Sequence, residues 1–180
     1  MSKAKELDQY YTREAVAIEC LNLIPERFKT NKYTWIEPTC GTGAFFNNFP
    51  SETTNIALDI DPKIPNATQQ DFLTYTNSSE NLVVVTSPPF GVEGQLAIDF
   101  LKHATTFADV VCVLIPLVFK HNEYESDFRK QWMKIVCKDL DPNIFIHEGE
   151  PFSFPCVFQV WEKVELKDRR ISYLNESYKI

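Results

Sequence analysis

Two apolar, β-branched runs constrain the fold of this 180-residue chain more than any other feature. Residues 82–86 read LVVVT, and residues 110–115 read VVCVLI. Strands that are apolar at every position are typical of sheets buried on both faces, where helices cover both sides of a mostly parallel sheet. The two runs therefore predict an α/β fold with a doubly wound sheet.

The other apolar segments alternate between the helix and strand periods, as this fold requires. We expect further strands at 33–36, 55–58, 67–70, 144–147 and 156–161. We expect helices at 12–24 (capped by Thr12), 95–107 and 124–138, and a brief helix after Gly43. The last two strands leave no room for a helix between them. They predict a hairpin that adds one antiparallel strand to the sheet.

Composition bounds the function classes. The net charge of −7 argues against a protein that coats nucleic acid by charge alone. Five scattered cysteines without a C-x-x-C pair indicate reduced thiols in an intracellular, non-secreted protein without a zinc site. His103, His121 and His147 are too dispersed for a metal cluster. No apolar run approaches the ~18 residues of a membrane span, so we expect neither a membrane nor a metal partner.

Four of the five glycines, namely Gly41, Gly43, Gly91 and Gly94, lie just after two predicted strands. In a doubly wound sheet, ligands bind outside the carboxyl ends of the strands. Glycine lets the backbone turn tightly and approach a ligand there. The paired pattern therefore predicts a binding site. Neither the dinucleotide fingerprint nor the lysine of a nucleotide-triphosphate loop follows Gly41-Thr42-Gly43.

Two carboxylates lie at the ends of the next predicted strands. Asp59 comes eighteen residues after Gly41, where a carboxylate accepts hydrogen bonds from ribose hydroxyls. Asp71 follows the third strand, with Phe72 beside it as an apolar face for an adenine ring. Each aspartate alone is more typical of a turn or cap. In this order and spacing, the pair favours adenosine binding.

The motifs "DQYYT" (8–12), "EPTCGTGAF" (37–45), "ALDID" (57–61), "QQDFL" (69–73) and "SPPFG" (87–91) resemble those of class I S-adenosylmethionine-dependent methyltransferases. Their order is similar to enzymes that modify exocyclic amines of nucleic-acid bases. The small stand-alone adenine-N6 methyltransferases of phages and viruses are most similar, through to "PCVFQVWEK" (155–163). Small ribosomal-RNA adenine methyltransferases of eukaryotes show a similar arrangement. The resemblance implies a Rossmann-like sheet of seven strands and S-adenosylmethionine as cofactor.

The resemblance also implies roles for individual residues. The implied cofactor-binding residues are Tyr11, Thr12, Glu37, Thr39, Cys40, Gly41, Gly43, Asp59, Ile60, Asp71, Phe72 and Ser87. The implied catalytic residues are Ser87, Pro88, Pro89 and Phe90, and the implied substrate-binding residues are Phe90, Gly91 and Lys120. Two consecutive prolines make the neighbouring carbonyls rigid, so that acceptors for an amine are preorganised. An aromatic ring stacks on a base taken out of its helix.

Two departures from the adenine-N6 pattern keep alternatives open. Ser87 stands where that family has Asn or Asp, and serine there resembles the cytosine-N4 methyltransferases. Leu117 and Val118 replace the basic and hydroxyl residues that phage relatives carry after the fifth strand. The alternatives are cytosine-N4 methylation, protein-glutamine N5 methylation, and a degenerate subunit that binds cofactor or nucleic acid for a partner.

We expect one domain over 1–180, with a core at 8–163, a charged tail at 164–180 and no separate target-recognition domain. Target recognition is then slight or comes from a protein partner, and the expected substrate is DNA or RNA. Basic residues pose a choice between a solvated face and a stripe that follows phosphates. They are Arg129, Lys130, Lys134 and Lys138, and then Lys163, Lys167, Arg169 and Arg170.

Overall fold

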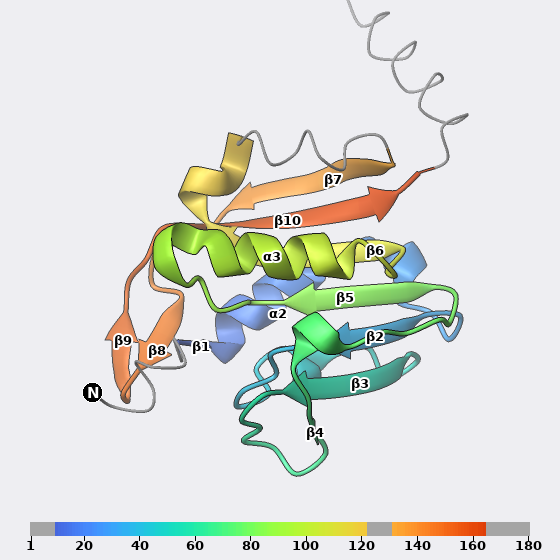
Figure 1. Cartoon of the computed structure of the whole chain (residues 1–180). Helices are drawn as coiled ribbons and strands as arrows, with labels where there is room; N and C mark the ends of the chain where they lie inside the picture. The colour runs from blue at the N-terminus through green and yellow to red at the C-terminus, as the bar shows by residue number, and fades with distance from the viewer. Residues whose placement is uncertain (1–9, 122–130, 165–180) are drawn as a thin grey trace, which may run out of the picture.

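The computed structural model describes residues 10–121 and 131–164, and a seven-stranded sheet forms its centre (Figure 1). The strand order is β4-β3-β2-β5-β6-β10-β7. The strands are β2 (Thr34–Glu37), β3 (Thr54–Asp59), β4 (Thr68–Gln69), β5 (Leu82–Thr86), β6 (Val110–Pro116), β7 (Trp132–Asp139) and β10 (Cys156–Lys163). Neighbours from β4 to β6 pair in parallel, whereas β10 is antiparallel to β6 and to β7. The predicted doubly wound, mostly parallel sheet with one antiparallel strand is confirmed.

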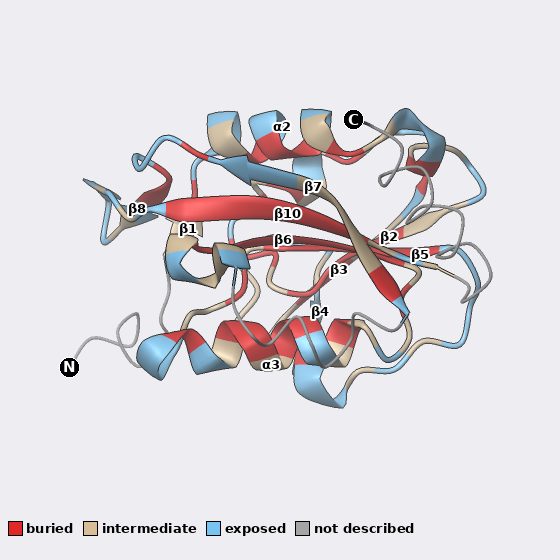
Figure 2. Ribbon diagram, turned by 90° about the horizontal axis from the view of Figure 1, so that it is seen from above, coloured by how far each residue is buried: buried red, intermediate tan, exposed pale blue. Residues whose placement is uncertain are grey.

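Helices α2 (Glu14–Leu23) and α3 (Gln95–Ala104) lie on opposite faces of this sheet (Figure 2). Short 3-10 helices complete the connections: η1 (Glu26–Phe28), η2 (Phe46–Asn48), η3 (Phe72–Thr74), η4 (Val92–Gly94) and η5 (Leu117–His121). The helix expected after Gly43 is the single turn η2. Helix α3 ends three residues before its predicted boundary at 107.

Alternate residues of each central strand pack against different helices. Val83 and Val85 of β5 belong to the core under α2, whereas Leu82 and Val84 belong to the core under α3. Strand β6 alternates in the same way, and all of its residues are buried. Because both faces are covered, apolar residues are favoured along these strands, and buried Thr86 at the end of β5 is a polar exception. This explains the two continuous apolar runs in the sequence.

A second, three-stranded sheet has the order β1-β8-β9 and consists of β1 (Tyr11–Thr12), β8 (Phe145–His147) and β9 (Glu150–Phe152). It lies at the end of the molecule toward which β2, β3 and β5 point (Figure 1). Strands β8 and β9 form a hairpin around Glu148 and Gly149, which both have positive φ. Two-residue turns of this kind match the twist of the flanking strands. The small sheet thus borders the carboxyl ends of the large one.

The helix predicted at 124–138 is wrong where it can be compared. Residues 122–130 lie outside the described residues, and Trp132–Asp139 forms strand β7. Lys134 and Lys138, four residues apart, look like one helix face, but in β7 they pair with Trp161 and Phe158 of β10, which face opposite sides of the sheet. The ladder with the eight-residue strand β10 decides between the two. Of the other basic residues, Arg129, Lys130, Lys167, Arg169 and Arg170 lie outside the described residues.

Two further predictions need correction. Residues 144–147 and 156–161 do not pair with each other, because β8 pairs with β1 and β9 while β10 pairs with β6 and β7. Thr12 does not cap the first helix; it lies in β1, and Arg13 is the N-cap without a side-chain hydrogen bond. Pairing with Phe145 holds Thr12 extended, so the helix begins at Glu14.

Within residues 10–121 and 131–164, no helix is long and apolar enough to cross a bilayer.

We expect Leu114→Ala to destabilise the protein by about 2–5 kcal/mol, because it opens a cavity in a strand buried on both faces. Leu114 is fully buried, whereas Leu73 is 37% exposed. Leu73→Ala, the same chemical change at a partly exposed site, is the control and should stay within about 1 kcal/mol. Urea unfolding with an unchanged m-value would measure both. Equal losses for the two variants would contradict this account of the core.

Candidate functional site

The loops that follow four parallel strands converge on one pocket of about 570 Å³. It opens at the carboxyl ends of β2, β3, β4 and β5, the position at which doubly wound sheets bind ligands. The structure brings twelve of the residues with predicted roles into its lining. They are Tyr11, Thr39, Gly41, Asp59, Ile60, Asp71, Phe72, Ser87, Pro88, Pro89, Phe90 and Gly91.

In the loop after β2, the backbone at Gly41 lies very close to the ring of Tyr11. Gly41 has a φ of +46°, a left-handed conformation that favours glycine. A Cβ atom at this position would lie 2.9 Å from two ring carbons of Tyr11, so a larger residue would displace the tyrosine. The N–H of Cys40 donates to the carbonyl of Leu58 in β3. The loop is therefore held between the start of β1 and the end of β3.

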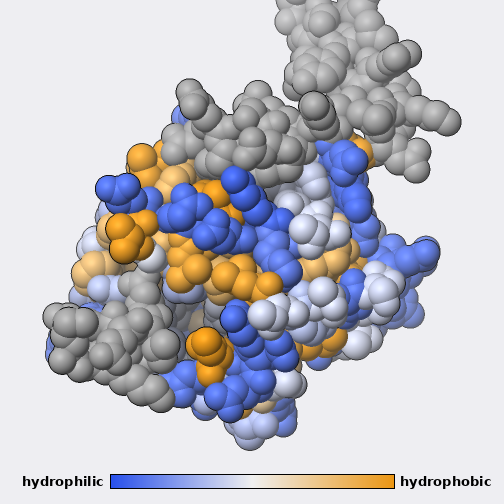
Figure 3. Space-filling view, viewed as in Figure 1, coloured by the Kyte–Doolittle hydropathy of each residue, from blue (hydrophilic) through white to orange (hydrophobic). Residues whose placement is uncertain are grey.

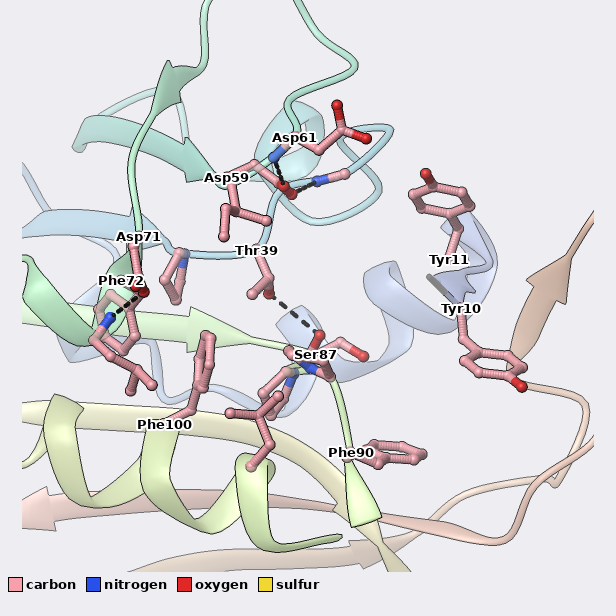
Figure 4. Close-up of a pocket in the computed structure, with 18 of the residues that line it drawn as sticks. Tyr10, Tyr11, Thr39, Asp59, Asp61, Asp71, Phe72, Ser87, Phe90 and Phe100 are labelled. Atoms are coloured by element: carbon pink, nitrogen blue, oxygen red, sulfur yellow. Dashed lines mark hydrogen bonds between the residues drawn. The ribbon is translucent and has the colours of Figure 1, made fainter. Parts of the chain in front are cut away.

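Asp59 organises the polar end of the pocket through its two carboxylate oxygens (Figure 4). Oδ2 accepts a hydrogen bond from the N–H of Gly41 at 2.7 Å, and Oδ1 accepts one from the N–H of Asp61 at 2.8 Å. Each carboxylate oxygen has a second lone-pair direction. Asp59 thus fixes the loop and still has capacity to accept hydrogen bonds from a ligand.

Phe72 lies at the more apolar end of the pocket, and the carboxylate of Asp71 precedes it. Oδ1 of Asp71 accepts from the N–H of Leu73 at 2.9 Å, so Asp71 caps η3. The Phe72 ring is buried against Phe100, with 5.3 Å between ring centroids, and against His103 at 5.0 Å. Both Phe72 and Phe100 line the pocket. Their rings offer a fixed apolar surface for a planar ligand.

The turn after β5 carries the two prolines and the aromatic ring. Pro88 is buried, while Ser87, Pro89 and Phe90 are half-buried in the wall of the pocket. Phe90 packs edge-to-face on Phe145 with ring centroids 5.7 Å apart. It also packs at a tilt on Phe154, at 5.4 Å. These neighbours fix the orientation of the ring.

A second pocket, of about 360 Å³, lies on the other side of Phe90. Tyr10, Phe90 and Gly91 line both pockets. The second pocket is strongly aromatic, with Tyr10, Phe90, Phe119, Phe152 and Phe154 in its lining. Tyr10 is itself held by stacking on His147 of β8, with ring centroids 4.3 Å apart. The small sheet therefore supplies one wall of this pocket.

Exposed apolar side chains gather around the two pockets. Val92, which is 84% exposed, Ile60 and Leu73 line the first pocket, and Val118 lines the second. On the face shown in Figure 3, apolar surface (orange) interrupts the hydrophilic surface (blue). Gly91, with a φ of +67°, permits the turn beside them, since a Cβ there would lie 2.7 Å from Cβ of Leu96. Exposed apolar residues around a cavity are typical of ligand contact.

Among residues 10–121 and 131–164, carboxylates are the only charged side chains in the lining of the two pockets: Asp59, Asp61 and Asp71 in the first and Glu93 in the second. Lys63 lies beside the first pocket, where its Nζ is 2.6 Å from Oδ2 of Asp61. Burial raises the pKa of the Tyr11 phenol, and the neighbouring Lys63 opposes this effect. The lining suits a neutral or positively charged ligand better than an anion.

Five residues with predicted roles lie outside both linings: Thr12, Glu37, Cys40, Gly43 and Lys120. Glu37 is only 2% exposed, and its Oε2 accepts from the N–H of Phe46 at 2.7 Å. Lys120 forms an ion pair with Asp139 at 2.8 Å. Lys134 contacts the same region, donating from Nζ to the carbonyl of Lys120. Glu37 and Lys120 thus have structural partners.

Burial favours the neutral forms of two acids, Glu37 at the end of β2 and Cys40 in the loop that follows. Burial raises the pKa of the Glu37 carboxyl well above its ordinary value, against the opposing hydrogen bond from Phe46. Burial also raises the pKa of the Cys40 thiol to about 12. A thiol with such a pKa is a poor nucleophile at neutral pH.

Sequence reasoning missed several lining residues: Tyr10, Asp61, Leu73, Leu96, Phe100 and Phe145. Asp61 and Leu73 lie within motifs that were recognised, so their neighbours carried the signal. Leu96 and Phe100 are in α3, where apolar spacing indicates the core face equally well. Tyr10 likewise lies within a recognised motif, DQYYT (8–12), whereas Phe145 is in β8, whose pairing leaves no local pattern in the sequence.

Among the described residues, no group of three His, Cys, Asp or Glu side chains is arranged to hold a metal ion.

No protein-family model matches the sequence, and no curated protein shows a significant match. Solved structures, however, share the fold. A Pyrococcus horikoshii protein considered to be an RNA methyltransferase has a TM-score of 0.66 at 17% identity, with 88% of this chain and 89% of that chain covered. The modification subunit of a Vibrio vulnificus protein considered a type I restriction enzyme has a TM-score of 0.64 at 12% identity. The match covers 86% of this chain and 44% of that chain.

Magnesium protoporphyrin IX methyltransferase from Synechocystis, in a structure with S-adenosylmethionine bound, has a TM-score of 0.51 at 11% identity, with 83% of this chain and 77% of that chain covered. All three proteins are described as methyltransferases or modification subunits. At these identities the likeness concerns the fold alone. The chain therefore has the Rossmann-like fold of these methyltransferase structures.

We expect Glu37→Gln to become more stable relative to wild type as pH rises above about 4.5, the ordinary pKa of a glutamate. A folded-state pKa above the unfolded one means that ionisation of Glu37 opposes folding, so wild type loses stability as pH rises through the folded pKa. Gln keeps an acceptor for Phe46 without a charge. Urea midpoints at pH 4.5, 6 and 8 measure the trend, with exposed Glu52→Gln as control. A pH-independent difference for Glu37→Gln would contradict the assignment.

Proposed function

We propose that this protein is an S-adenosylmethionine-dependent methyltransferase that acts on the exocyclic amino group of a nucleic-acid base in DNA or RNA. The favoured target is N6 of adenine. One observation carries the proposal. The Ser87–Phe90 turn lines the same pocket as Asp59, Asp71 and Phe72. An adenosine-binding constellation and an amine-binding turn thus share one cavity.

The residues of the first pocket fit this cofactor. Its volume is within the roughly 300–1,000 Å³ of small-molecule sites. Asp59 retains lone pairs for ribose hydroxyls, and Phe72 and Phe100 offer an apolar surface for adenine. Carboxylates without a lining cation suit a ligand that carries a positive sulfur. When bound, the cofactor supplies a methyl group activated by that sulfonium.

The Ser87–Phe90 turn supplies acceptors for the amine. An exocyclic amine on an aromatic ring is a poor nucleophile, because its lone pair is delocalised into the ring. Acceptors for its two N–H groups localise that lone pair, and the Ser87 hydroxyl and the Pro88 carbonyl are the candidates. Pro88 and Pro89 restrict the backbone, so these acceptors are preorganised. The amine can lose its proton after methyl transfer, and no strong base is required.

The aromatic pocket behind Phe90 is suited to the base itself. Five aromatic rings line it, and stacking of a base on an aromatic ring is worth about 1–3 kcal/mol. The pocket opens next to the acceptors, because Phe90 and Gly91 belong to both pockets. A base removed from its helix fits such a pocket. The phosphates of the nucleic acid, in contrast, would be repelled by the carboxylates that line the two pockets. Two of the structures that share this fold are named as nucleic-acid-modifying proteins.

Other predicted contacts remain part of the proposal. Lys120 would have to leave Asp139 to contact a phosphate. No cation lines either pocket within the described part of the chain, which favours a protein partner that supplies further contacts to DNA or RNA. Ser87 supports a second candidate, cytosine-N4 methylation, because serine at this position resembles the cytosine-N4 methyltransferases.

Nucleoside mass spectrometry after incubation with cofactor and DNA or RNA tests the proposal. We expect N6-methyladenine, and Ser87→Ala should lower kcat by about tenfold or more, since it removes one of two acceptors. Methylation of cytosine N4 would select the second candidate. Label in protein alone would select glutamine methylation. Cofactor binding without any methylated product would indicate a degenerate subunit.

Calorimetry with S-adenosylmethionine tests the cofactor assignment independently. We expect Asp59→Asn to weaken binding at least about tenfold, because an amide presents only one acceptor oxygen to the loop N–H groups and the ribose. Asp141→Asn, the same change at an exposed position outside both pockets, is the matched control. Equal affinity of Asp59→Asn and wild type would reject the assignment.

A further inference from the structure

The hydroxyl of Thr39 connects the loop after β2 with the turn after β5 (Figure 4). Its Oγ1 lies 2.9 Å from Oγ1 of Thr86 and 3.2 Å from the carbonyl oxygen of Ser87. Thr39 belongs to the loop that contains Gly41, and Ser87 begins the Pro-Pro turn. The contact therefore joins the two segments that the proposed function assigns to the cofactor and to the acceptor amine.

Hydrogen-bond accounting gives this contact a direction. A threonine hydroxyl has one hydrogen to donate. Thr86 is 1% exposed, and a buried hydroxyl without a partner costs about 1–3 kcal/mol. When Thr86 donates to Thr39, Thr39 is left to donate to the Ser87 carbonyl, and all three groups are paired. The opposite direction leaves Ser87 without this donor, so the chain runs from Thr86 through Thr39 to Ser87.

The Ser87 carbonyl is an effective point at which to hold the turn. Pro88 and Pro89 have no N–H, so this stretch has fewer donors with which to anchor itself. The Ser87 carbonyl belongs to the peptide group between Ser87 and Pro88. Holding it restrains the Ser87 backbone, from which the side-chain hydroxyl extends, and the position of the Pro88 carbonyl. A donor at the Ser87 carbonyl thus controls the two acceptors that the proposed reaction uses.

We propose that Thr39 is a positioning residue: its hydroxyl, supported by Thr86, fixes the Ser87–Phe90 turn from the cofactor loop. The catalytic consequence rests on the proposed function, whereas the ordering of the turn does not. Because the two segments share a hydrogen-bond chain, they form one unit across the central strands β2 and β5.

Three variants separate positioning from stability. Thr39→Val keeps the shape but removes the donor, and it leaves the Thr86 hydroxyl unpaired. Adding Thr86→Val replaces both partners by apolar groups of the same shape, which can be nearly neutral for stability. Thr53→Val is the matched control, because buried Thr53 donates to the Pro50 carbonyl at 2.8 Å and lies outside both pockets. The Thr53→Val variant shows how the loss of a buried hydroxyl outside the pockets affects stability and amide exchange.

Hydrogen–deuterium exchange of the amides of Phe90, Gly91 and Val92 in the free protein is the first measurement. We expect exchange about fivefold faster in Thr39→Val, the factor that corresponds to one lost hydrogen bond. The double variant should exchange equally fast although its unfolding free energy recovers. Thr53→Val should exchange as wild type does. Wild-type exchange in the double variant would overturn the proposal.

This measurement needs neither cofactor nor acceptor, so a negative methylation assay bears on the proposed function alone. Where methylation is found, the double variant should lose about tenfold in kcat while its cofactor Kd changes less than about twofold. Thr39→Ser, which restores a hydroxyl, should recover most of the lost kcat. A fall in cofactor affinity with unchanged kcat would instead assign Thr39 to cofactor binding and overturn the positioning role.

Discussion

Burial of β5 and β6 on both faces is the constraint from which the rest of the structure follows. Alternate residues of these strands pack under α2 and under α3, so the sheet needs a helix on each side. Chain segments that cross between parallel strands then place all the carboxyl ends at one edge. The loops that begin at Pro38, Ile60, Gln70 and Ser87 meet there and form the pocket.

Local pattern was enough to predict the parallel strands. The bounds of β5 match the apolar run 82–86, and the other parallel strands lie within one residue of their predicted ends. Pattern failed where distant segments decide the structure. Residues 132–139 are extended because β10 pairs with them, and β8 leaves the expected hairpin because β1 and β9 pair with it. Such pairing energies have no local trace in the sequence.

The residues of the candidate site likewise fall into those that local sequence pattern predicts and those that it does not. Residues at the end of a strand or directly after it, such as Asp59 and Ser87, were predictable because strand ends share an edge. Leu96 and Phe100 were not, because an apolar helix residue can face the core or a cavity with the same spacing. Nor did the sequence show how Asp59 divides its capacity between the loop and a ligand. The backbone N–H groups of Gly41 and Asp61 determine that.

Tyr10 and Phe90 form a partition with two sides, since each ring borders both pockets. A substitution at either position therefore alters two binding surfaces at once. In an evolving lineage, a change at Phe90 that alters one pocket also alters the neighbouring pocket, and compensation has to come from residues that border only one of them. Phe119 and Phe152 on one side, and Ile60 and Leu73 on the other, are free of this coupling. Substitutions that adapt one pocket to a new ligand are therefore expected at residues that border that pocket alone, whereas Tyr10 and Phe90 are expected to stay unchanged.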